Sequence, residues 1–87
     1  MKTAIRNRAN NYLSVVSRQY WPHVPLGDIS AALSALGIEV ESCILCGAGG
    51  QDRIALTEQG KPSKSMLCLS WYRMPVTGNY EVTAYVS

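Results

Sequence analysis

The sequence predicts a single α+β domain in which two N-terminal helices pack on one face of a four-stranded antiparallel sheet. Three observations lead to this fold class. Apolar residues recur with helical spacing up to about residue 36, they alternate with a period of two from residue 38 onward, and connections containing glycine or proline separate the segments. A run of helices followed by a run of strands favours an antiparallel sheet over βαβ units. The chain of 87 residues fits one domain, residues 1–87.

The first helix is expected from Thr3 to about Tyr20. Its apolar positions form one continuous helical face, and they are Ile5, Ala9, Tyr12, Leu13, Val16 and Tyr20. We expect Thr3 to cap the N-terminus. The pair Trp21–Pro22 should end the helix, because proline disfavours helical conformation in the residue before it. The polar side chains of this segment, Arg6 and Asn10 among them, are expected to face water.

A second, shorter helix is expected from Ile29 to Leu36. Asp28 is a suitable N-cap, and Gly37 stands where a left-handed residue commonly ends a helix. About two turns have little stability of their own, so this helix must form by packing on its neighbours.

Four strands are expected over residues 38–45, 52–58, 65–74 and 80–87, with a polar loop over residues 59–64. The third of these strands has large apolar or aromatic side chains on both faces. One face carries Trp71 and Arg73, and the other carries Tyr72 and Met74. Since two helices can cover only one face of the sheet, one of these two sets is expected to stay uncovered. The alternation alone leaves both assignments open.

Composition excludes several classes of protein. Hydrophobic residues make up 47% of the chain, which is too many for a disordered tail. No apolar run approaches the ~20 residues needed to cross a bilayer, and arginines interrupt the first residues before a signal peptide pattern forms. We therefore expect no membrane contact and a cytosolic protein, in which the three cysteines stay reduced.

A zinc site is one interpretation of the cysteines. Cys43 and Cys46 form a C-x-x-C motif followed by glycine, as in a zinc knuckle, and Cys68 and His23 are available as third and fourth ligands. No second C-x-x-C is present, however, and cysteines three apart in an extended strand point to opposite faces. Buried structural thiols are the alternative interpretation. No other cofactor is expected.

The basic residues of the first segment suggest a nucleic-acid contact. Residues 1–27 contain four cations and no acid, and the cations are Lys2, Arg6, Arg8 and Arg18. The rest of the chain has a net charge of −2. Such asymmetry is a mild indication of an anionic partner. The alternative is a solvated helix face.

The sequence does not predict an enzyme. His23 is the only histidine, and it lies in a proline-flanked connection. No serine stands in a Gly-x-Ser-x-Gly motif, and no pair of carboxylates is expected in a cleft.

A protein-binding surface is the leading functional hypothesis. The candidate contact residues are Trp71, Tyr72, Arg73 and Tyr85. Tryptophan, tyrosine and arginine are enriched at protein interfaces. The alternatives are a central strand that is wholly buried and a homodimer that covers the exposed side chains.

The C-terminal residues resemble a known group of proteins. The phrase Leu69-Ser-Trp-Tyr-Arg-Met-Pro75, followed by Tyr80-Glu-Val-Thr-Ala-Tyr-Val86, is similar to the end of small uncharacterised proteins of bacterial plasmids and phages. The resemblance covers about the last twenty residues and contains no catalytic motif. Mobile elements encode short inhibitors of host defence such as anti-CRISPR proteins. The resemblance therefore implies a binder of a host protein or nucleoprotein complex.

Overall fold

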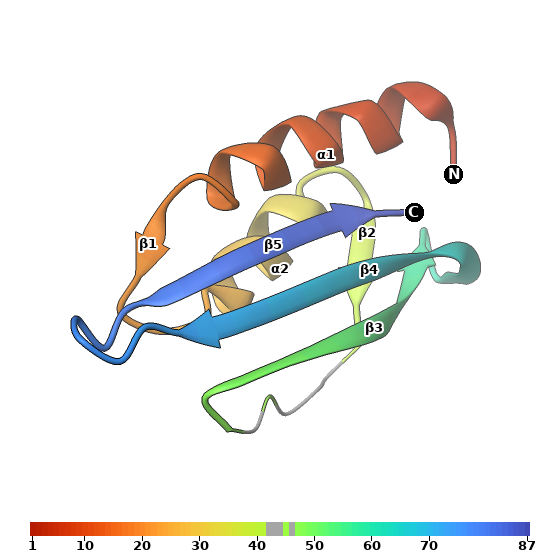
Figure 1. The fold of residues 1–87 in the computed structure, drawn as a ribbon. Coiled ribbons are helices and arrows are strands. Elements are labelled where there is room, and N and C mark those ends of the chain that lie inside the picture. The colour runs from red at the N-terminus through yellow and green to blue at the C-terminus, as the bar shows by residue number, and fades with distance from the viewer. Residues whose placement is uncertain (42–44, 46) are drawn as a thin grey trace.

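The computed structural model describes residues 1–41, 45 and 47–87 of the chain. In this part of the chain the elements are α1 (Thr3–Val16), β1 (Tyr20–Trp21), α2 (Leu26–Ser34), β2 (Ile38–Val40), β3 (Gly49–Glu58), β4 (Lys61–Arg73) and β5 (Tyr80–Val86). The strands form one antiparallel sheet in the order β1-β5-β4-β3-β2, with α1 running beside β5 and α2 behind the sheet (Figure 1). No helix of the described residues is long and apolar enough to span a membrane.

The predicted α+β class is confirmed, but the expected number of four strands is wrong by one. Tyr20 and Trp21 form β1, which pairs with β5, instead of ending the first helix. The helix ends at Val16, and Ser17 donates a hydrogen bond from its Oγ to the carbonyl of Leu13 at 2.8 Å. The Trp21 indole Nε1 then donates to the carbonyl of Val16 at 3.0 Å. These bonds turn the chain, so Tyr20 leaves the helical face on which it was expected.

The helices follow the predicted apolar faces with altered boundaries. Ala9, Leu13 and Val16 of α1 are buried. Lys2, not Thr3, occupies the N-cap position and makes no side-chain cap bond. In the second helix the expected start is wrong by three residues. Because α2 begins at Leu26, Asp28 lies in its first turn, where its charge suits the helix dipole.

The strands also differ from the expected boundaries. The polar loop expected over residues 59–64 is wrong: Gln59 and Gly60 form a two-residue turn with φ of 49° and 79°. Such left-handed pairs match the twist of hairpin strands, and β4 therefore begins at Lys61. The register between β3 and β4 shifts near Pro62, which has no N–H to donate. Of the expected first strand, residues 38–40 form β2, and residues 42–44 lie outside the described residues.

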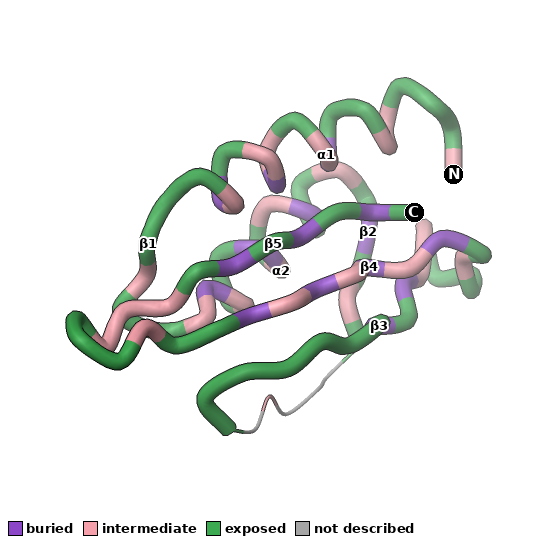
Figure 2. Tube along the Cα trace, viewed as in Figure 1, coloured by how far each residue is buried: buried purple, intermediate pink, exposed green. Residues whose placement is uncertain are grey.

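The core lies between the helices and one face of the sheet. Side chains alternate strictly along β5, where Val82, Ala84 and Val86 are buried and the residues between them are exposed (Figure 2). The same alternation in β4 buries Trp71, which is 8% exposed and belongs to the core cluster that includes both helices. The structure thus assigns the Trp71 side of the third predicted strand to the helices.

Side chains of α1 complete the outer edge of β5. Asn10 donates from Nδ2 to the carbonyl of Val86 at 3.0 Å, and its Oδ1 accepts the Val86 N–H at 2.7 Å. About two turns further along, Ser17 Oγ at the C-cap of α1 accepts the Ala84 N–H at 3.1 Å. These contacts satisfy backbone groups that a neighbouring strand would otherwise pair. The expectation that Asn10 faces water is therefore wrong.

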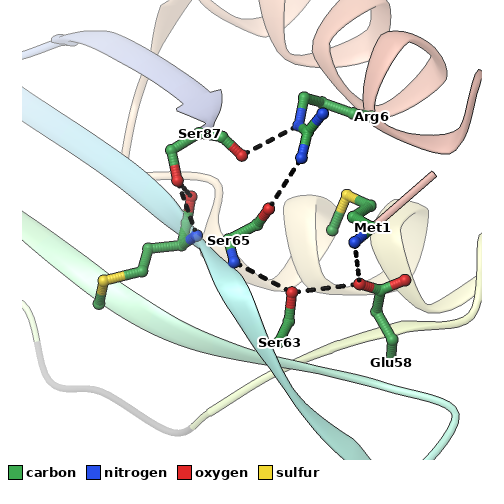
Figure 3. A network of polar contacts seen from close by, with 7 residues as sticks. Met1, Arg6, Glu58, Ser63, Ser65 and Ser87 are labelled. Carbon is green, nitrogen blue, oxygen red and sulfur yellow. Dashed lines mark hydrogen bonds and ion pairs between the residues drawn. The ribbon is translucent and has the colours of Figure 1, made fainter. Parts of the chain in front are cut away.

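A second polar network ties the start of α1 to residues of β3 and β4 and to Ser87, which follows β5 (Figure 3). Arg6 donates from Nε to the carbonyl of Ser87 at 3.1 Å and from Nη2 to Ser65 Oγ at 3.3 Å. The amine of Met1 forms an ion pair with Glu58 at 3.2 Å. Arg6, also expected in water, is half-buried and holds the helix against the sheet.

Gly50 makes room for the Trp71 indole. The two residues are paired between β3 and β4, and a Cβ on Gly50 would lie 2.9 Å from Trp71 Cζ2. The ring therefore crosses the backbone of its partner strand, as is common where an aromatic residue covers a strand glycine.

We predict that Asn10→Ala destabilises the fold by about 1–3 kcal/mol, because it leaves the Val86 N–H and carbonyl without partners. Urea unfolding measures the change. Asn11→Ala is the matched control, since Asn11 is exposed on the same helix. Equal stability of the two variants would contradict the role of Asn10.

We predict that Gly50→Ala destabilises the fold by about 1–3 kcal/mol, because the added methyl group displaces a packed indole. The NMR signal of the Trp71 indole should shift at the same time. Gly27→Ala is the control, because a Cβ at Gly27 would meet nothing within 4 Å. A stable Gly50→Ala variant with an unmoved indole would refute the packing described.

Candidate partner-binding face

The sheet face opposite the helices carries side chains from four strands in three cross-strand rows. Tyr20, Glu81 and Tyr72 form the first row, Thr83, Ser70 and Gln51 the second, and Tyr85, Cys68 and Arg53 the third. Directly paired residues of antiparallel strands point to the same side of a sheet. We call these nine residues the open face.

Three tyrosines give the open face its apolar surface. Tyr20 is 64% exposed, Tyr72 55% and Tyr85 51%. Among the described residues only Val15 and Val76 are other large apolar side chains with comparable exposure. The exposed aromatic area of the described chain is therefore gathered on the face that no helix covers.

Two shallow hollows lie side by side on the open face. The larger, of about 530 Å³, is lined by residues that include Arg53, Cys68 and Tyr85. The smaller, of about 420 Å³, is lined by residues that include Tyr72 and Glu81. Both share the uncharged polar side chains of the middle row, Gln51, Ser70 and Thr83. The short side chains of Ser70 and Thr83 lie between Tyr72 and Tyr85 and form a low floor beside these larger rings.

The chemistry of the larger hollow centres on Tyr85. The Cys68 side chain raises the pKa of the Tyr85 phenol, first through hydrogen bonding and then through Coulombic repulsion, and desolvation adds to this rise. The Arg53 guanidinium acts in the opposite direction and lowers it, but the pKa stays above its ordinary value. The phenol therefore remains a neutral hydrogen-bond donor throughout the physiological pH range.

The structure separates the four residues predicted to bind a partner. Tyr72 and Tyr85 lie on the open face. Trp71 is buried beneath the helices, since its side chain points to the opposite side of β4 from that of Tyr72. Arg73 is exposed at the end of β4, beside Gly78 of the turn that follows. Because Trp71 is buried on the helix side, only Tyr72 and Tyr85 of the predicted aromatic residues can contact a partner.

The four basic residues predicted to contact nucleic acid differ in their surroundings. Arg6 is engaged by Ser87 and Ser65. Lys2, Arg8 and Arg18 are exposed, and Arg18 donates to Ser14 Oγ at 3.4 Å. Three of the four predicted cations thus remain exposed, in or next to α1.

The predicted zinc ligands are only partly within the described residues. Cys43 and Cys46 lie outside them. Cys68 lies on the open face, whereas His23 lies beside Trp71 and Tyr80 on the helix side. In the part of the chain that the structure describes, no three histidine, cysteine or acidic side chains gather around one position. The zinc site stays a prediction.

Sequence patterns did not identify Tyr20, Arg53 or Glu81 as contact residues. Tyr20 is expected in the first helix, and neither charged residue is a candidate for partner binding. Trp21–Pro22 was the available signal for Tyr20, because it already required the chain to leave the helix near that point. The grouping of Arg53 and Glu81 with the tyrosines depends on strand register, which single-strand alternation does not contain.

We predict that Cys68→Ala lowers the pKa of Tyr85 toward the ordinary tyrosine value, because the thiol is the main cause of its rise. A titration followed by NMR of ring-labelled tyrosine distinguishes Tyr85 from the other tyrosines. Arg53→Gln should have the opposite effect, since Arg53 lowers the same pKa. An unchanged pKa in Cys68→Ala would show that the thiol does not act on this phenol.

Comparison of the chain with protein-family models, with curated proteins and with solved structures found no match. The resemblance of its C-terminal residues to small plasmid and phage proteins stays a prediction.

Proposed function

We propose that the chain is a non-catalytic binding protein that uses the open face to occupy a surface of another protein or nucleoprotein complex. The carrying observation is the exposure of Tyr20, Tyr72 and Tyr85 on the sheet face that the helices leave uncovered. Solvent-facing strand positions need only polar side chains. Three large rings there expose apolar area that a partner would remove from water.

The composition of the open face supports a protein partner. Its residues are tyrosine, serine, threonine, glutamine and cysteine with one arginine and one glutamate. Tyrosines surrounded by small polar residues are typical of binding surfaces, because the ring adds contact area with little loss of side-chain entropy. Depletion of charge in the centre is also typical of interface cores.

The open face is smaller than a standard protein interface. Its residue centres span about 14 Å across the strands and about 13 Å along them. A standard interface buries about 800 Å² on each partner. A partner that buries this area would therefore also contact the margin of the face, where Met66 and Lys64 follow along β4.

The C-terminal resemblance supports a host protein or nucleoprotein complex as the partner to test first, as for an anti-defence inhibitor such as an anti-CRISPR protein. A second copy of the chain is the alternative occupant. Nucleic-acid binding through α1 has less support, because Arg6 is held by Ser87 and Ser65.

We predict that Tyr72→Ala and Tyr85→Ala each weaken partner binding by at least about tenfold, as is usual for central aromatic contacts. Affinity capture from bacterial lysate, followed by binding measurements with the purified partner, tests this. Val76→Ala is the matched control, because Val76 is 97% exposed but lies in the β4–β5 turn. Trp71→Ala is unsuitable, since removing a buried tryptophan costs about 3–5 kcal/mol of stability.

Full binding by both tyrosine variants would remove the open face as the interface. Light scattering over a range of protein concentrations measures the molecular mass, and so shows whether the chain forms a homodimer. A dimer that dissociates in Tyr72→Ala would assign the face to a second copy.

A further inference from the structure

Glu81 lies between two exposed tyrosines in the first row of the open face. It is paired with Tyr20 of β1 on one side and with Tyr72 of β4 on the other. Directly opposed residues in neighbouring strands have Cβ atoms about 5 Å apart. The carboxylate is therefore flanked by a phenol ring on each side, and all three side chains are exposed.

The carboxylate of Glu81 has no cation within its own chain among the described residues. The described residues form one ion pair, between Met1 and Glu58. It lies near the C-terminal end of β5, whereas Glu81 lies at the start of that strand. Glu81 instead lines the smaller hollow together with Tyr72, above the short side chains of Ser70 and Thr83. The hollow, of about 420 Å³, is large enough to admit the end of a long side chain.

We propose that this row receives a cationic side chain, lysine or arginine, from a partner protein. This inference rests on the proposed function of the open face and adds the chemistry of the partner. Ring faces carry negative charge density and attract cations, and the carboxylate between them adds direct charge pairing. The apolar stem of a lysine or arginine would lie along the tyrosines while its charged end meets Glu81.

The same row disfavours nucleic acid as the ligand of the open face. Exposed tyrosines on a sheet can stack with bases, but the backbone that follows the bases is anionic. Glu81 would place a negative charge in the middle of that path. The sign of the charge at position 81 therefore separates a basic protein partner from a nucleic acid.

The test is an NMR titration of the full chain with the peptide acetyl-Gly-Arg-Gly-amide and with its citrulline analogue, which has the same shape and no charge. We expect the arginine peptide to shift the backbone signals of Tyr20, Tyr72 and Glu81, and the citrulline peptide to leave them in place. Glu81→Gln should weaken the arginine peptide about fivefold, as expected for an exposed ion pair supported by aromatic rings. Glu41→Gln, another exposed glutamate, should not weaken it.

Equal responses to the two peptides, or unchanged affinity in Glu81→Gln, would overturn the inference. A single-stranded oligothymidine that binds this row more tightly in Glu81→Gln would assign it to nucleic acid instead. The purified partner could also fail to bind Tyr72→Ala and Tyr85→Ala but bind Glu81→Gln as tightly as the unchanged chain. That result would support the proposed function and reject the cationic contact.

Discussion

The paired hydrogen bonds between Asn10 and Val86 are the constraint on which the arrangement of the two layers depends. A strand at the edge of a sheet presents backbone groups that need partners. Here a side-chain amide offers a donor and an acceptor as a neighbouring peptide would, and Ser17 Oγ accepts one further bond, from the Ala84 N–H. Since these bonds hold α1 along β5, the apolar face of the helix meets only one side of the sheet. The uncovered side follows from that placement.

The same edge also builds the candidate site. Ser17 bonds both to the helix it ends and to β5, so the chain leaves α1 directly above that strand. The Trp21 indole then fixes the turn by bonding to Val16. Only two residues remain for β1, and their register places Tyr20 opposite Glu81. An edge contact needed for stability thus brings a tyrosine from the first third of the sequence onto a face made mainly by the last third.

Periodicity predicted the parts of the fold that one element decides alone. The buried positions of α1 and the strict alternation in β5 follow from helical and strand spacing, and the structure agrees with both. Strand β1 could not be predicted, because two residues are too few to show a period. Which side of β4 is buried could not be predicted either, because both sides carry large apolar residues. Gly50 shows how the helix side accommodates the indole: because this glycine has no Cβ, the Trp71 ring packs against β3 there. This relation exists only once β3 and β4 are in register.

The choice of tyrosine explains how the open face can be both exposed and adapted to binding. A leucine or tryptophan surface of this extent would favour uncontrolled association, whereas each phenol keeps a hydroxyl in water and presents its ring to a partner. Short side chains between the rings leave hollows that water fills at little cost. The free protein therefore needs no cover for this face to be stable. A partner gains by displacing that water from the rings, and because Glu81 stands between two of them, it gains most when it brings a positive charge to that row.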